Sequence, residues 1–155
     1  MREPGALGFS KIRFDPTPLH AFMLPYTPFD WTQGGLFEGL RCFHSGAFFE
    51  AHEHWESVWL AAQEPEKTFL QGLIQVAAAF HHFQRGNCAG TISLMRSALR
   101  RLDRYPEVFA AVVVAPLRVA IRRWLEALEA APQSSWPPVP QLQLTASGSV
   151  SRNSL

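Results

Sequence analysis

At 155 residues, the chain is long enough to form one domain with a substantial core. The composition is 47% hydrophobic, 12% aromatic and 17% charged, which is typical of a globular protein and excludes a wholly disordered chain. The formal net charge of +1 gives no overall reason to expect a nucleic-acid or membrane partner.

The cysteines and the apolar segments predict a cytoplasmic protein. Cys42 and Cys88 lie far apart and form no CxxC pair, a pattern that favours reduced thiols over a disulfide framework or a zinc ribbon. The longest apolar stretch, residues 69–83, is interrupted by glutamine and histidine, so no membrane span is expected. The N-terminus lacks a hydrophobic segment followed by a small-residue cleavage site, so no secretory signal is expected either.

The N-terminal part of the chain predicts an extended arm followed by two helices. Residues 1–33 combine prolines with large apolar side chains, as in DPTPLHAFMLPYTPFDW, which favours an ordered arm on the body. Residues 34–45 predict a short helix that stops near Gly46. Residues 47–63 predict a second helix that ends before Pro65.

Further helices follow toward the C-terminus. A third is expected at about 66–85, where Gly86 terminates it and Asn87 provides an N-cap for a fourth helix at about 88–104. The segment 107–131 contains Pro116 and predicts one or two more helices. No alternation typical of strands is visible, so the predicted fold is all-α: a compact array of about five or six helices with an extended N-terminal arm.

The C-terminal segment has a different composition from the helical domain predicted at residues 34–131. Residues 132–155 are rich in proline and then in serine, without periodicity, and predict a disordered tail.

Polar side chains recur where the second and third helices would be expected to pack. On a helical wheel of about 100° per residue, three of them lie within or beside the apolar wall of the second helix, and others form an arc on the third. Because consecutive helices with a short link pack as antiparallel neighbours, the two polar arcs are expected to face each other in a buried cluster. Its members are His52, Glu53, Glu56, Gln71, Gln75 and His82.

The predicted cluster has a structural and a chemical interpretation. Buried carboxylates that accept bonds from amides and imidazoles can be purely architectural. Alternatively, His52 and Glu56 are one helical turn apart, and with His82 they could hold a divalent metal, with Glu53 as general base of a hydrolase. The letters HEHWE differ from the HExxH pattern of zinc peptidases because glutamate replaces the second histidine.

Arginines concentrate in the C-terminal half of the chain. Such a row could contact phosphates as a nucleic-acid accessory surface, or it could complement the acidic second helix within one subunit or across a homodimer. The residues are Arg96, Arg100, Arg101, Arg104, Arg118, Arg122 and Arg123.

Two long motifs resemble a known family. The segment FHSGAFFEAHEHWESVW, followed by FLQGLIQVAAAFHHFQRGN, is similar to the bacterial, archaeal and plastid family called domain of unknown function 309. The resemblance covers about residues 36–103 and implies a compact all-helical array without an established activity, substrate or cofactor. Besides the cluster, it implies signature roles for Phe43, Gly46, Glu50, Trp59, Gly72, Gly86 and Asn87.

Two details qualify the resemblance. His44 stands where the family usually has asparagine, and the helical wheel directs Glu50 outward although it belongs to the signature.

Taken together, the sequence features favour a non-catalytic binding or scaffold domain, in which a homodimer is one expected assembly. The metal-dependent hydrolase and the nucleic-acid accessory protein are the alternatives. The sequence identifies no small-molecule ligand.

Overall fold

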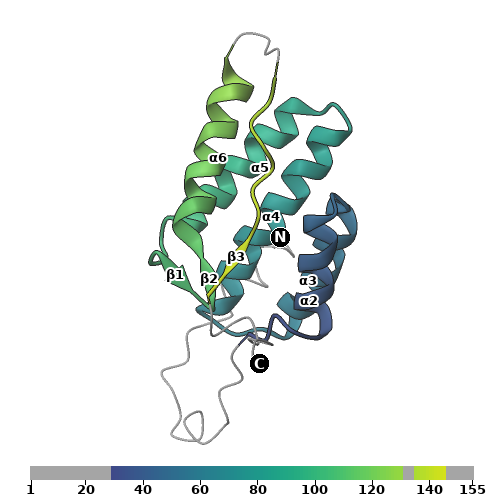
Figure 1. Ribbon diagram of the computed structural model, residues 1–155, viewed down its shortest axis with the longest axis vertical. Helices are drawn as coiled ribbons and strands as arrows, with labels where there is room; N and C mark the ends of the chain where they lie inside the picture. The colour runs from purple at the N-terminus through teal and green to yellow at the C-terminus, as the bar shows by residue number, and fades with distance from the viewer. Residues whose placement is uncertain (1–28, 131–134, 146–155) are drawn as a thin grey trace, which may run out of the picture.

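The computed structural model describes residues 29–130 and 135–145, which form a helical array with one small sheet (Figure 1). The expected all-α architecture is confirmed in this part of the chain, with a minor β addition. The elements are α2 (Gly34–His44), α3 (Phe48–Ala61), α4 (Glu66–Gln84), α5 (Cys88–Leu102), β1 (Val108–Phe109), β2 (Val112–Val113), α6 (Val114–Glu129) and β3 (Gln143–Leu144).

Each helix packs mainly against its neighbours along the chain. Helix α2 pairs with α3, α3 with α4, α4 with α5, and α5 with α6, so that α4 lies between α3 and α5 (Figure 1). This order follows from the short connections, which make consecutive helices pack side by side.

The turns between helices depend on the residues expected to form them. Gly46 and Gly86 adopt φ values of +85° and +77°, a region that glycine enters without steric cost. The side chain of Asn87 accepts a hydrogen bond of 2.9 Å from the backbone N–H of Gly90 and so caps α5. The predicted helix stop and N-cap at this turn are confirmed.

Aromatic side chains fill much of the core. Trp55 has no exposed surface, stacks on Phe43 with ring centroids 5.7 Å apart, and meets Trp31 edge to face at 6.2 Å. Phe80 of α4 contacts Trp124 of α6 at 5.1 Å. These rings bury large apolar areas and, apart from Trp31, come from α2, α3, α4 and α6, whose packing they constrain, whereas α5 has no aromatic residue.

The segment predicted to hold one or two final helices begins instead with a hairpin. Strands β1 and β2 pair antiparallel, and Ala110 and Ala111 between them adopt positive φ values of 49° and 66°. A single helix, α6, then contains Pro116 in its first turn, where a missing backbone N–H costs no helical hydrogen bond.

Residues 135–145 correct the prediction of a disordered tail from residue 132 onward. Trp136 stacks on Trp124 with ring centroids 5.8 Å apart, and Leu142 is buried at 5% exposure. Strand β3 then joins the sheet beside β2. The composition does not reveal that this segment is ordered, because the contacts that hold it are made to residues remote in sequence. The rest of the predicted tail and most of the predicted arm, residues 1–28, lie outside the described residues.

Within residues 29–130 and 135–145, the helices are too short or too polar for any of them to cross a bilayer.

Candidate functional site

Helix α3 buries one face and presents another to solvent. Its buried side is formed by Phe48, Ala51 and Trp55. The opposite side, which we call the α3 outer face, is a row of residues four, three and four positions apart that lies along one helical stripe. Its members are Phe49, Glu53, Glu56 and Leu60, all of which are exposed.

The α3 outer face combines apolar and acidic groups. Phe49 is 45% exposed and Leu60 is 70% exposed, although both are large apolar side chains. The carboxylates of Glu53 and Glu56 lie between them along the stripe and reach solvent. Two apolar side chains therefore flank two carboxylates on the same helical stripe.

His52 lies at the edge of this face. Its side chain is 29% exposed and its Nδ1 lies 3.8 Å from Oε2 of Glu56. That nitrogen is buried and has no hydrogen-bond partner. The His52 ring stacks on Phe49 with centroids 6.2 Å apart, and Phe49 in turn contacts His81 of α4 at 5.3 Å. The imidazole is thus held in place by ring contacts instead of a polar network.

The glutamines of α4 do not meet the acidic groups of α3. The Nε2 of Gln75 donates to Oγ of Ser97 at 3.0 Å, and Nη1 of Arg101 donates to Oε1 of Gln75 at 3.2 Å. Gln75 therefore joins α4 to α5. Gln71 is half-buried, and its side chain makes no hydrogen bond to any described residue.

His82 belongs to the turn that connects α4 and α5. Its Nδ1 lies 2.9 Å from Nδ2 of Asn87, the residue that caps α5. This contact orients the cap, so His82 supports a helix start rather than a shared polar site.

The predicted buried cluster is therefore divided among three places. His52 and Glu56 lie at the α3 surface, Gln75 lies between α4 and α5, and His82 lies at a turn. The physical reason is helix rotation: α3 buries the arc centred on Ala51 and Trp55, and this turns its carboxylates outward. The six predicted members were His52, Glu53, Glu56, Gln71, Gln75 and His82, of which both glutamates are exposed.

The metal site predicted from His52, Glu56 and His82 is not assembled. Across residues 29–130 and 135–145, no three histidine, cysteine, aspartate or glutamate side chains are grouped as metal ligands would be. The donor set required by the hydrolase alternative, three ligands and a base, is likewise not brought together in this part of the chain.

Several residues of the family signature contribute to packing between the helices. Phe43 is 1% exposed in the core, and a Cβ added to Gly72 would lie 3.1 Å from Cδ2 of Leu102, so this glycine permits close packing of α4 and α5. The ammonium group of Lys67 lies 4.3 Å from the ring centroid of Trp59, a cation–π contact between α4 and α3. Glu50 is exposed, as the helical wheel predicts.

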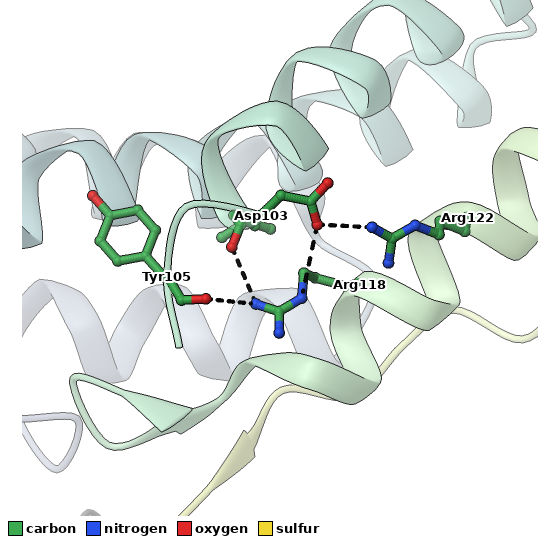
Figure 2. Close-up of polar contacts among 5 residues, drawn as sticks. Asp103, Tyr105, Arg118 and Arg122 are labelled. Carbon is green, nitrogen blue, oxygen red and sulfur yellow. Dashed lines mark hydrogen bonds and ion pairs between the residues drawn. The ribbon is translucent and has the colours of Figure 1, made fainter. Parts of the chain in front are cut away.

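Four of the seven arginines of the predicted row make internal contacts, and two of these, Arg118 and Arg122, are drawn in Figure 2. The Nη1 of Arg118 donates to the carbonyl oxygens of Leu102 and Tyr105, each at 3.1 Å, where α5 ends. Arg122 donates to Oδ1 of Asp103 at 2.8 Å, which joins α6 to α5. The guanidinium of Arg118 satisfies helix-terminal carbonyls, a role that no sequence pattern indicated.

Other arginines divide between paired and unpaired positions. Arg96 forms an ion pair with Glu129, and Arg101 is held by Gln75 and Ser97. Among the seven arginines of the predicted row, Arg100, Arg104 and Arg123 are exposed and form no side-chain hydrogen bond or ion pair within the described residues. The continuous phosphate-contacting row predicted from the sequence is thus interrupted by internal pairing.

Part of the chain matches a known protein family. The sequence profile of the family described as "Domain of unknown function (DUF309)" matches residues 36–94. Residues 36–94 are therefore similar to DUF309 proteins. This match confirms the family resemblance, and the DUF309 segment covers most of α2, all of α3 and α4 and the first half of α5.

One relative was found among curated proteins. It is an uncharacterised protein of Aquifex aeolicus (strain VF5), 31% identical over 91 residues. The aligned part is 58% of this chain but 27% of that relative, so the chain spans about a quarter of the relative's length. Neither the DUF309 description nor this relative names an activity, substrate or partner.

Proposed function

We propose that this protein is a non-catalytic binding domain whose binding surface is the α3 outer face. The observation that carries the proposal is the exposure of Phe49 at 45% and Leu60 at 70% on the same stripe as two solvent-facing carboxylates. Large apolar side chains at a surface favour association, since burying such a side chain contributes roughly 1.5–3 kcal/mol.

The acidic residues define the chemistry of the partner. Glu53 and Glu56 lie between the two apolar side chains, so a partner must present cationic groups flanked by apolar ones. A helix or helical surface with basic and apolar residues on one face meets this requirement, because its side chains repeat at the same spacing as those of α3.

The alternatives have less support. A metal-dependent hydrolase needs ligands that converge, and the described residues bring His52 and Glu56 together without a third. A nucleic-acid surface needs a row of free cations, whereas four of the seven C-terminal arginines make internal contacts.

A defined peptide tests the proposal. The probe is a synthetic helical peptide with leucine and arginine on one face, added to dilute protein while amide hydrogen exchange is followed. We expect added protection in α3, residues 48–61, and weaker protection at the same peptide concentration in the Glu53→Gln/Glu56→Gln variant. Glu50→Gln is the matched control, because Glu50 is also exposed on α3 but lies off the stripe. Protection confined to other helices, or none at low salt, would reject the proposal.

A further inference from the structure

The outer side of α5 has features complementary to the α3 outer face. A shallow hollow of about 380 Å³ is lined by residues that share this side of the helix: Ala89, Ile92, Ser93, Arg96 and Arg100. Its floor is apolar near the start of α5, and the arginines follow along the helix. Arg100 has no ionic partner in the described part of the chain.

Contacts with α4 place the starts of α3 and α5 at the same height. At the C-terminal end of α4, Phe49 of α3 packs on His81 with ring centroids 5.3 Å apart. At the same end, Asn87, which caps α5, contacts the neighbouring His82 at 2.9 Å. Phe49 and the start of α5 therefore flank the same turn of α4.

The far ends of the two helices also correspond. Trp59, near the end of α3, lies beside Lys67 at the start of α4. Leu102, the last residue of α5, packs against Gly72, little more than one turn along α4. Helices α3 and α5 thus run in the same direction, opposite to α4, and each packs against it.

This arrangement has a consequence for a second copy of the chain. Consider a second copy that is related to the first by a two-fold rotation about an axis parallel to α4, on the solvent side of this helix. The rotation leaves the position of each residue along the axis unchanged, and it exchanges the sides on which α3 and α5 lie. Helix α3 of each copy then lies over α5 of the other, and the two helices run in the same direction. Phe49 of one copy faces the apolar floor of the hollow, and Glu53 and Glu56 face the arginines that follow it.

The side of α4 nearest the axis suits close approach. Ala78 is small and partly exposed, and the half-buried side chain of Gln71 has no hydrogen bond to the described part of the chain. Since the half-turn preserves height, Gln71 of one copy meets Gln71 of the other, and two carboxamides can donate to and accept from each other. A half-turn about an axis across α4 would instead place carboxylates over carboxylates, which charge repulsion opposes.

We infer that the partner of the α3 outer face is a second copy of this chain, bound through the α5 hollow in a two-fold dimer. This inference rests on the proposed function, because it names the occupant of the same surface. Each interface contains the contact of Phe49 with the hollow and the charge contacts of Glu53 and Glu56 with Arg100 and with Arg96, whose guanidinium is shared with Glu129 of its own chain, and the symmetry provides both twice.

Charge reversal tests the dimer in the full chain. The Glu56→Arg and Arg100→Glu variants each place like charges at both interfaces, and sedimentation equilibrium is expected to show dimer dissociation constants raised by at least about tenfold. An equimolar mixture of the two variants restores opposite charges at both interfaces, so the heterodimer is expected to form with near wild-type affinity. Arg123→Glu, an exposed unpaired arginine on α6, is the control and should leave association unchanged.

The outcomes separate this inference from the proposed function. A wild-type chain that stays monomeric up to high concentration, or a dimer unaffected by either reversal, would overturn the inference. If the leucine–arginine peptide still increases hydrogen-exchange protection of α3 in a monomeric chain, the proposed binding surface is supported and its partner is another protein. If neither dimer nor peptide contact is found, both proposals fail. Circular dichroism of each variant checks that the helical fold is retained.

Discussion

The Nε2 atom of His44 accepts a hydrogen bond of 3.1 Å from the backbone N–H of Leu142, and so joins the end of α2 to the C-terminal segment. Only an imidazole without a proton on Nε2 can accept this bond. The residue is exposed as a whole, yet partial burial of its ring lowers the pKa of His44 below the ordinary histidine value.

This contact predicts a pH-dependent attachment of the C-terminal segment. Because the folded pKa of His44 lies below its unfolded value of about 6.5, the unfolded chain binds more protons between the two values. The stabilisation is fully present above the unfolded pKa and is lost as pH falls from about 6.5 toward the folded pKa. We expect hydrogen exchange at the Leu142 amide to increase over this interval.

The His44→Gln variant provides the control. Glutamine offers an acceptor at similar reach but does not titrate, so the Leu142 amide should lose its pH response beyond the intrinsic exchange rate. If wild type and His44→Gln showed the same pH response at this amide, the imidazole would not be the acceptor that matters.

Arg118 is expected to be important for stability without taking part in binding. Its Nη1 donates to two carbonyl oxygens at the end of α5, those of Leu102 and Tyr105 (Figure 2). Replacement by methionine leaves both carbonyls without this donor and should lower the free energy of unfolding by about 1–3 kcal/mol. Arg123→Met, which removes an exposed arginine without a partner, should change it by less than about 0.5 kcal/mol. Equal effects of the two variants in urea denaturation would contradict this role.

Gly39 is predicted to be intolerant of any side chain. A Cβ at this position would lie 2.3 Å from Cδ1 and Nε1 of Trp55, a ring that has no exposed surface. Although alanine gains up to about 1 kcal/mol over glycine in helix propensity, overpacking costs about 1–3 kcal/mol or more. Gly39→Ala should therefore lower the melting temperature. A melting temperature equal to or above that of wild type would show that α2 and α3 can separate without cost.

Much of the helical architecture can be predicted from local signals. Gly86 and Asn87 mark a helix end and the next cap, and both roles are found in the structure. Pro65 and Pro116 lie at helix starts, as the missing backbone N–H requires. The β1–β2 hairpin could not be predicted, because it depends on two alanines with positive φ, which are unusual at that conformation.

The orientation of α3 could not be derived from its sequence. Apolar residues occur on both sides of the helix, so the wheel permits either Phe49 or Trp55 to face the core. The choice is made by distant aromatic rings: Trp55 is enclosed by Phe43 and Trp31. Since neither partner lies on α3, helical periodicity alone assigned the carboxylates to the interior.

Glu56→Ala distinguishes the surface position from the buried position predicted by the sequence. A buried carboxylate would strand its partners and cost about 1–3 kcal/mol on removal. The Glu56 side chain is 51% exposed, so its removal is expected to change the free energy of unfolding by less than about 0.5 kcal/mol. Urea denaturation of wild type and Glu56→Ala gives this difference directly. A decrease in the free energy of unfolding above about 1 kcal/mol would indicate that Glu56 has a structural role.

The affinity of dilute protein for the leucine–arginine peptide, compared between wild type and the Glu53→Gln/Glu56→Gln variant, tests the central claim most directly. Two exposed charge contacts at about 0.5 kcal/mol each predict a dissociation constant about fivefold higher for the variant, with the difference shrinking at high salt. Glu50→Gln should bind like wild type. Equal dissociation constants for wild type and the double variant at low salt would contradict a binding role for the α3 outer face.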